Sequence, residues 1–282
     1  MKKTVGLLLT VAIVGSVILR AVRSGGAQKV PEAQNLAMSD ALKANMYTPA
    51  YCEAPLIDSE IVYFEDVEYV INTYNDNGTI LMAVGINDPD VIRKNHDNPE
   101  PFTPEEKDAA ARSHEYFSAY VKESMESKHG TTAENSALKG FLFTKHLGGS
   151  RENAGLCLYG GGTVYMESGV NRMQIPSVYI EGYVEPFATT CLQISSTISF
   201  GGLGVSVSCP PSNGFTSVSQ TAVQWNNPPV YNATQMYASV NGSLTAIAVF
   251  SIGFNVNMSS YFTSQRGNSL TVITASHTTS YI

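Results

Sequence analysis

The sequence predicts two unlike regions: an α+β N-terminal region, made of a β-hairpin and a long helix, and then an all-β domain with the antiparallel β-sandwich as its expected form. Three observations support this fold class. Residues 153–282 carry only five charged side chains, whereas roughly a quarter of the residues of an average sequence are charged. The same stretch contains many short apolar segments between turn residues. A hairpin signal and a strong helix start precede it.

We expect three segments along the chain: a signal peptide or short anchor over 1–27, the α+β domain over 28–150, and the charge-poor all-β domain over 151–282. The 282 residues are enough for two hydrophobic cores. The net charge is −7, and lysine and arginine form no cluster. Because nucleic-acid backbones bind to clustered cations, we expect no nucleic-acid partner.

The N-terminus has the pattern of an export signal. Lys2 and Lys3 precede an uncharged run of 16 residues, Thr4 to Leu19. A membrane span needs about 20 apolar residues, so the run fits a signal peptide better. Arg20 and Arg23 follow it and keep an uncleaved anchor open as the alternative. Either way, we expect a secreted protein or one on the extracytoplasmic cell surface.

The N-terminal hairpin is predicted over residues 69–86. Asn77-Gly78 supplies the two positive φ angles that a type I′ turn requires. A two-residue turn there places Ile71 opposite Val84, and the other apolar residues fall on the same face.

The long helix is predicted from Pro104 to His129. Thr103 is a favourable N-cap, and Glu106 completes a capping box three residues later. A shorter helix over 133–143 is expected to follow, with the junction to the second domain at residues 146–150.

The all-β domain is predicted from nine strand segments with turn residues between them, among them Gly160-Gly161-Gly162. A second Asn-Gly pair, Asn241-Gly242, predicts a hairpin, followed by a long strand over 244–258. The segments are Leu156–Tyr159, Thr163–Met166, Val178–Val184, Leu192–Phe200, Val205–Cys209, Ser217–Trp225, Val230–Val240, Leu244–Met258 and Leu270–Ala275.

Four cysteines in an exported chain favour two disulfides. We expect Cys191–Cys209, which brackets a hairpin, together with Cys52–Cys157. Four buried free thiols are the alternative. We expect no metal site, because no C-x-x-C motif or ligand-spaced histidine accompanies these cysteines.

The sequence contains no recognisable catalytic, phosphate-binding or cofactor-binding motif, so we expect no cofactor. An exported hydrolase using Glu167, Glu181 or His146 is a third-ranked hypothesis, which only the presence of these residues supports. His114, on the long helix, is expected to be a solvated side chain.

The predicted ligand-binding residues are Tyr179, Glu181, Tyr183, Glu185 and Trp225. The first four alternate along one strand and so share a face. Tyrosines interleaved with carboxylates suit a sugar or peptide ligand. In the competing interpretation, the glutamates are exposed to solvent, and the tyrosines and Trp225 pack in the core.

The first functional hypothesis is therefore a non-enzymatic binding protein that uses its Ser/Thr/Tyr-rich β-domain to contact a glycan, a cell surface or another protein. The alternative is a membrane-active protein, pore-forming in character, whose amphipathic hairpins contact a bilayer. The sequence leaves both open.

Overall fold

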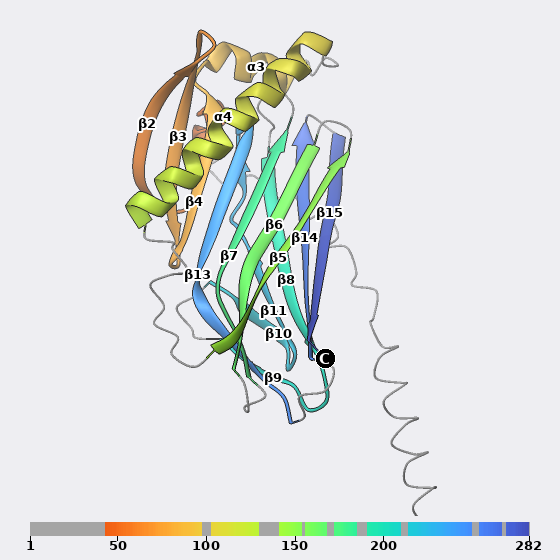
Figure 1. Cartoon of the computed structure of the whole chain (residues 1–282). Helices are drawn as coiled ribbons and strands as arrows, with labels where there is room; N and C mark the ends of the chain where they lie inside the picture. Colours follow the sequence, from red (N-terminus) through yellow and green to blue (C-terminus); the bar gives the residue numbers. More distant parts are fainter. Residues whose placement is uncertain are drawn as a thin grey trace, which may run out of the picture. The chain divides into compact units, whose positions relative to one another are not determined.

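The structure is a computed structural model, and it describes residues 43–97, 103–129, 141–153, 156–167, 172–184, 191–209, 214–249, 254–266 and 269–281. The expected signal peptide lies outside these residues. Residues from Asp40 to Ile282 form one compact unit. This unit consists mainly of antiparallel β-strands, with two helices among the described residues (Figure 1).

The first of two sheets, sheet I, has the strand order β2-β3-β4-β13-β7-β6-β5, and β9 pairs with β13. Its strands are β2 (Leu56–Phe64), β3 (Val67–Asp76), β4 (Thr79–Ile86), β5 (Phe141–Asn153), β6 (Leu156–Glu167), β7 (Arg172–Val184), β9 (Ser206–Ser208) and β13 (Gln235–Ile247).

The second sheet, sheet II, has the order β1-β12-β8-β11-β10, and β8 also pairs with β14, which pairs with β15. Its strands are β1 (Tyr51–Cys52), β8 (Cys191–Gly201), β10 (Thr216–Ser219), β11 (Ala222–Asn226), β12 (Val230–Tyr231), β14 (Phe254–Arg266) and β15 (Ser269–Tyr281).

One hydrophobic core receives side chains from both sheets. Leu81 and Ile180 of sheet I join Ile198 and Phe262 of sheet II in it. The N-terminal strand β4 pairs with β13, so both halves of the sequence build sheet I. The domain boundary expected near residue 150 falls inside β5, and the compact unit has no division there.

The N-terminal hairpin forms as predicted. β3 and β4 pair Tyr69 with Ile86 and Ile71 with Val84. Asn77 and Gly78 adopt φ angles of 51° and 90° at the turn. The register, the turn residues and the apolar pattern therefore agree, because each requires the same face to be buried.

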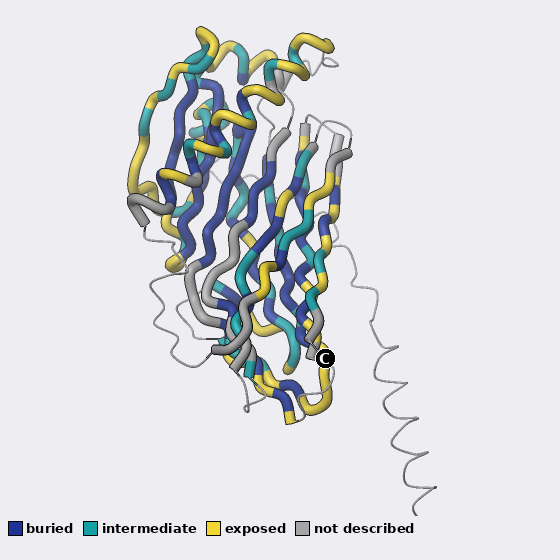
Figure 2. Tube along the Cα trace, viewed as in Figure 1, coloured by how far each residue is buried: buried dark blue, intermediate teal, exposed yellow. Residues whose placement is uncertain are grey.

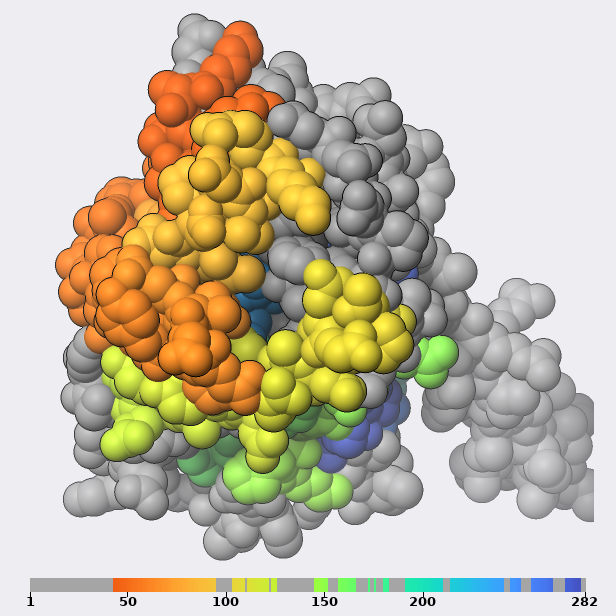
Figure 3. Space-filling view, turned by 90° about the horizontal axis from the view of Figure 1, so that it is seen from above, coloured from red at the N-terminus to blue at the C-terminus, as the bar shows by residue number. Residues whose placement is uncertain are grey.

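Helix α4 (Pro104–His129) begins with the predicted capping box. The Glu106 amide donates to the Thr103 hydroxyl at 3.2 Å, and the Thr103 amide donates to the Glu106 carboxylate at 2.8 Å. The helix crosses β3 and β4 on the face opposite the shared core (Figure 1), where Phe117 and Val121 pack on residues of the hairpin. Seen from above, α4 (yellow-green) adjoins the orange surface of the hairpin (Figure 3).

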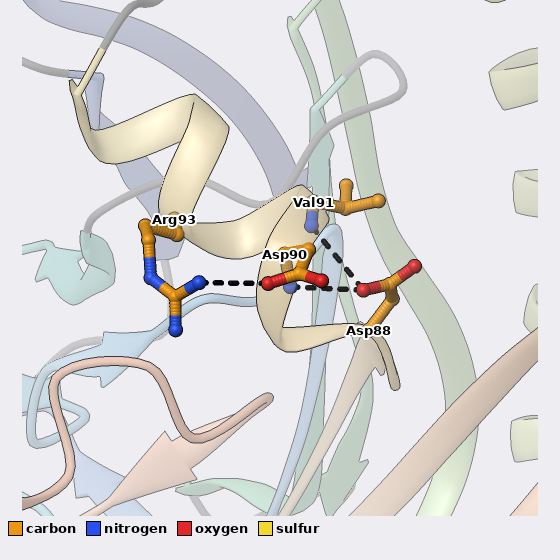
Figure 4. Close-up of polar contacts among 4 residues, drawn as sticks. All are labelled: Asp88, Asp90, Val91 and Arg93. Carbon is orange, nitrogen blue, oxygen red and sulfur yellow. Dashed lines mark hydrogen bonds and ion pairs between the residues drawn. The ribbon is translucent and has the colours of Figure 1, made fainter.

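The shorter helix α3 (Pro89–Asp97) also has a side-chain cap. The Asp88 carboxylate accepts hydrogen bonds from the amides of Asp90 and Val91, and Arg93 forms an ion pair with Asp90 at 2.7 Å (Figure 4). This cap fixes the chain direction at the end of β4.

Two local predictions are wrong near residue 150. Residues 141–143, expected to end a helix, begin β5. Gly160-Gly161-Gly162, expected to be a turn, lies inside β6. A Cβ atom on Gly160 would come within 2.8 Å of the Ser260 hydroxyl oxygen of sheet II. Glycine is needed here for close packing between the sheets and not for a turn.

The hairpin predicted at Asn241-Gly242 is also wrong. β13 runs straight through this pair, with a register shift between Asn241 and Leu244. β7 pairs with β13 on both sides of the shift, so the chain is held extended and the Asn-Gly pair forms a bulge. The predicted strand 244–258 is accordingly divided between β13 and β14.

Candidate functional site

Of the predicted ligand-binding residues, the structure describes the side chains of Glu181 and Trp225, and both are buried. Glu181 is 5% exposed and Trp225 is 1% exposed. Tyr179 and Tyr183 hold positions of β7 on the same face as Glu181, but their side chains lie outside the described part. Glu185 is also outside the described residues. The charge of Glu181 predicts an exposed side chain, and this prediction is wrong because α4 lies over it.

Glu181 is held beneath α4 by two helix side chains. Its Oε1 lies 3.2 Å from Nε2 of His114, and the Ser118 hydroxyl donates to its Oε2 at 3.3 Å. In the sheet ladder Glu181 stands between Tyr237 and Tyr159. The expectation of a solvated His114 is therefore wrong, because its side chain faces the sheet and contacts Glu181, which α4 covers.

A second pair of contacts extends this polar cluster. The Gln235 side-chain amide donates to the Ser113 hydroxyl of α4 at 3.3 Å, and the Tyr237 hydroxyl donates to Gln235. Burial, followed by the charge of Glu181, raises the pKa of Tyr237 well above its ordinary value. The cluster thus links α4 to sheet I through hydrogen bonds between side chains.

Trp225 belongs to the shared core. It lies in β11 beside Gly214, whose added Cβ would come within 3.4 Å of the indole ring. Because Trp225 is buried, it cannot stack on a ligand at the surface. It is a residue of the core, as the competing interpretation expected.

The prediction of two disulfides is wrong, because none of the four cysteines is in a disulfide bond. Cys191 begins β8 in sheet II, whereas Cys209 follows β9 in sheet I and directs its thiol toward the Phe215 carbonyl at 3.4 Å. Cys52 lies in β1 of sheet II, and Cys157 lies in β6 of sheet I. The pairing prediction failed because the segment between Cys191 and Cys209 crosses from one sheet to the other instead of forming a hairpin.

An open polar surface lies on the outer face of sheet II. Along β14, Val256, Met258, Ser260 and Phe262 are buried against the core, and the odd-numbered residues from Asn255 to Gln265 lie on the opposite face. Asn257 and Ser259 are two of these outward residues. The alternation is visible as changing colours along β14 and β15 in Figure 2. Alternation of this kind is what a strand with one buried face requires.

Cross-strand pairing brings the outward residues of neighbouring strands into rows. Asn257 stands between Thr278 of β15 and Ser199 of β8. Ser259 faces Ser276, and their hydroxyl oxygens are 3.0 Å apart. We define the polar face as the half-buried or exposed side chains Gln193, Ser195, Ser199, Gln224, Asn226, Asn255, Asn257, Ser259, Thr263, Gln265, Thr274, Ser276 and Thr278.

The polar face consists of hydroxyl and amide groups, and one exposed apolar side chain, Val272, stands among them opposite Thr263. Some of them orient one another: the Gln224 amide donates to the Ser195 hydroxyl at 2.8 Å and to the Asn226 carbonyl at 3.2 Å. Tyr261, 7% exposed, lies among them between Thr274 and Ser195. The face therefore offers donors and acceptors without an ionic charge.

Sequence reasoning missed this face, although its signal was present. Polar residues alternate with apolar ones over 255–259, and Thr263 and Gln265 continue the same side of the strand. The pattern was used to predict strands and not to compare which polar faces become neighbours. Only the pairing of β8, β14 and β15 assembles them into one surface.

Other site types are not seen in the described ranges. No group of three or more histidine, cysteine, aspartate or glutamate side chains there could hold a metal ion. None of the described helices is long and apolar enough to cross a membrane.

Comparisons with known proteins give no close relative. No protein-family model and no curated protein matches the sequence. Solved structures match weakly. A structure described as a pore forming protein shares 7% identity over 49% of this chain and 90% of its own, with a TM-score of 0.24.

Two further structures are similarly distant. The Clostridium perfringens NetB toxin in its membrane-inserted form shares 8% identity over 49% of this chain and 93% of its own, with a TM-score of 0.17. A structure of manganese lipoxygenase of Gaeumannomyces graminis with part of zonadhesin of Komagataella pastoris shares 9% identity over 80% of this chain and 96% of its own, with a TM-score of 0.19. These scores are too low to support an argument about function.

Proposed function

We propose that this protein is a secreted or surface-displayed, non-enzymatic binding protein that uses the polar face of sheet II to bind a neutral glycan. The observation that carries the proposal is the composition of that face. Apart from Val272, each described outward side chain of β8, β14 and β15 that is half-buried or exposed carries a hydroxyl or an amide, and none is ionic. Export rests on the sequence of residues 1–27 alone.

The chemistry of the polar face suits sugar hydroxyls. A serine or threonine hydroxyl both donates and accepts, and an asparagine or glutamine side chain offers two donors and one acceptor atom. A neutral sugar has the same mixture of groups. Binding it would leave no charge desolvated and unpaired, which is the costly outcome at a polar interface.

The fold supports such a face if the two sheets form an antiparallel β-sandwich, and we propose this arrangement. The inner residues of β14 would then be fixed in the shared core. The outer residues would be held at the regular spacing of the strands, about 4.8 Å from one strand to the next. A rigid platform loses little side-chain entropy when it binds a ligand.

The experiment is a screen of the full chain against neutral and acidic oligosaccharides. We expect binding to neutral members of the panel. Asn257→Ala should weaken it by about tenfold, the loss of roughly one well-formed hydrogen bond and its geometry. Ser150→Ala, which alters an exposed serine of β5 in sheet I, is the matched control and should bind as the unaltered protein does.

The hydrolase hypothesis gains no support from these contacts. Glu181 is covered by His114 and Ser118, which leaves its carboxylate out of reach of a substrate. His146 is exposed on β5 and contacts Thr163 at 3.3 Å. The hairpin that first suggested a membrane-active protein does not form at Asn241-Gly242.

A further inference from the structure

Strand β2 forms one edge of sheet I. Within the described part of the chain it pairs with β3 alone, and it is the outermost strand in Figure 1. Most of its residues are exposed, so its tube is largely yellow in Figure 2. Edge strands are usually protected by being short or by carrying lysine or proline, but β2 has nine residues and contains neither. Its open side can therefore accept a further strand.

The turn between β2 and β3 determines which backbone groups face the open side. Glu65 and Asp66 form a two-residue turn with φ angles of 46° and 62°, and Phe64 pairs with Val67 across it. Such a turn is closed by hydrogen bonding between its flanking residues. Because bonded and non-bonded pairs alternate along an antiparallel ladder, every second residue of β2, starting with Tyr63, directs its amide and carbonyl away from β3.

The contacts of β3 agree with this alternation. Tyr63 stands opposite Glu68, and the Glu68 carbonyl accepts the Asn87 amide at 2.8 Å on the other side of β3. The backbone of Tyr63 therefore faces the open side, as do those of Ile61 and Ser59 earlier in the strand. We call Ser59, Ile61 and Tyr63 the open edge. A row of alternating amides and carbonyls is matched by the backbone of another extended chain.

The two faces of β2 differ in chemistry. Ile61 and Tyr63 lie on one face and are 49% and 69% exposed. Asp58 and Glu60 lie on the other face, where Glu60 stands opposite Ile71 of the hairpin surface that α4 covers. Side chains of an added strand would alternate in the same way. Those beside Ile61 and Tyr63 would contact apolar groups, and those beside Asp58 and Glu60 would contact carboxylates.

The charge around the open edge is acidic. Between residues 44 and 92 the sequence has nine aspartates and glutamates and no lysine, arginine or histidine. This segment contains the whole β2–β3–β4 hairpin region, and its negative charge exceeds the net charge of −7 of the entire chain. Oppositely charged cross-strand neighbours are stabilising, and like charges are destabilising. Lysine or arginine is therefore the matching residue type beside Asp58 and Glu60.

A second copy of this chain fits the open edge less well. Antiparallel pairing of two β2 strands would place Asp58 and Glu60 of both copies on one face, where the carboxylates repel one another. The net charge of −7 on each copy adds to this repulsion. The acidic side chains thus disfavour self-pairing and favour a cationic strand.

We propose that the open edge binds an extended segment of a partner protein in which apolar residues alternate with lysine or arginine. The segment adds a strand to sheet I and forms backbone hydrogen bonds with Ser59, Ile61 and Tyr63. Its apolar side chains lie beside Ile61, and its cationic side chains lie beside Asp58 and Glu60. This inference does not depend on glycan binding, because the polar face belongs to sheet II.

The test is fluorescence polarisation of the full chain with a labelled peptide of alternating lysine and valine. The peptide has about seven residues, enough to pair with β2 from Asp58 to Phe64. We expect saturable binding that weakens as salt is added, because salt screens the attraction between charges. The same peptide with glutamate in place of lysine should bind at least about tenfold more weakly.

Methylation of the peptide amides tests the edge without altering the protein. In the proposed register the valines stand opposite Ile61 and Tyr63 in hydrogen-bonded pairs, so the valine amides point toward β2 and the lysine amides point away. N-methylation of the valines should therefore abolish binding. N-methylation of the lysines is the matched control and should change the affinity by no more than about twofold.

Ile61→Pro tests the same edge from the side of the protein. It removes an amide that faces the open side, a change that edge strands tolerate. Binding of the lysine–valine peptide should fall by about tenfold or more. Ile61→Val keeps both the amide and an apolar side chain and should bind as the unaltered protein does.

Glu60→Gln tests the charge of the edge. It should weaken binding of the lysine–valine peptide by about threefold, since one carboxylate is lost from a partly solvated surface. Glu105→Gln is the matched control, because Glu105 is exposed and lies about 16 Å along α4 from Tyr116, the residue that stacks on Phe64 of β2. It should leave the affinity unchanged.

Four outcomes would overturn the proposal. They are no saturable binding of the lysine–valine peptide, equal binding of the glutamate peptide, equal effects of the two methylations, or unchanged binding by an Ile61→Pro protein that is folded by circular dichroism. If Ile61→Pro does not fold, the pair of methylated peptides decides. Sedimentation of the unaltered protein as a dimer that Ile61→Pro dissociates would show that a second copy covers the open edge, which also contradicts the proposal.

Discussion

His114 of α4 and Glu181 of β7 lie in contact, with Nε2 and Oε1 3.2 Å apart. The pair joins the only long described helix to the middle of sheet I, and the helix in turn covers the apolar face of the N-terminal hairpin. The carboxylate is buried, and its histidine partner is only 22% exposed. The stability of helix packing therefore depends on a polar contact in a shielded place.

Removing the histidine should destabilise the protein. In His114→Ala the Glu181 carboxylate stays buried, loses its histidine partner and keeps the hydrogen bond from the Ser118 hydroxyl. We expect the free energy of unfolding to fall by about 2 kcal/mol, the scale for a buried charge that loses one partner. Urea unfolding followed by the emission of the single tryptophan measures it. His146→Ala, at an exposed site, should change it little, and equal effects would contradict this account of the pair.

Packing between the sheets can be tested at Gly182. A Cβ on this residue of β7 would come within 2.8 Å of the ring of Phe262 in β14, and Phe262 is fully buried. Gly182→Ala should therefore lower the free energy of unfolding by about 1–3 kcal/mol, because the ring has little room to move.

Gly201→Ala is the matched control for that substitution. Its added Cβ would lie 3.4 Å from the Asn255 side chain, which is ordinary contact. Thermal unfolding monitored by circular dichroism compares the two. A Gly182→Ala protein as stable as Gly201→Ala would argue against the contact between β7 and β14.

The buried thiols predict a loss of stability at high pH. Burial raises the pKa of Cys52 to about 11 and that of Cys191 to about 12. In an unfolded chain a thiol ionises near pH ~8.5. Because the folded protein keeps these protons longer, the stabilisation is fully present below that value and is lost as the pH rises toward the folded pKa.

We expect the free energy of unfolding to fall by about 2 kcal/mol between roughly pH 8.5 and 11 on account of Cys52. Cys52→Ala should flatten the pH dependence over this range, as measured by urea unfolding at a series of pH values. Burial also raises the pKa of Tyr231 to about 12, so part of the alkaline loss should persist in the variant. A pH profile identical to that of the unaltered protein would contradict the burial of this thiol.

Removing the N-cap of α4 should destabilise the protein less than the substitutions above. Thr103→Ala removes the hydroxyl that accepts the Glu106 amide, and we expect a loss of about 1 kcal/mol. Thr103→Ser keeps the hydroxyl and should retain most of the free energy of unfolding that Thr103→Ala loses. If the alanine and serine variants unfold at the same urea concentration, the cap does not contribute.

In the N-terminal part of the fold, the hairpin and the start of the long helix could be predicted from short sequence patterns. At Asn77-Gly78 the turn chemistry, the apolar alternation and the register all pointed to one hairpin, and β3 and β4 pair as predicted. The Thr103–Glu106 capping box likewise marks the start of α4. Such features depend on residues close in sequence, so the sequence alone determines them.

The failures have a common physical origin, which is contact between elements that are distant in the sequence. Asn241-Gly242 has the same turn chemistry as Asn77-Gly78, but β7 pairs along both sides of it and keeps β13 extended. Glu181 was expected at the surface because its neighbours in sequence do not reveal that α4 lies over it. The polar face was not predicted for a related reason. Its rows combine residues of β8, β14 and β15, and strand pairing brings them together.

The central proposal, glycan binding at the polar face of sheet II, is tested most directly by the side-chain amide signals of asparagine in the nuclear magnetic resonance spectrum. The full chain is titrated with the neutral oligosaccharide that binds best in the screen. We expect the signals of the exposed residues Asn255 and Asn257 to shift with ligand concentration, and that of the buried Asn72 in sheet I to stay unchanged. Saturable binding that leaves Asn255 and Asn257 unmoved would contradict the account.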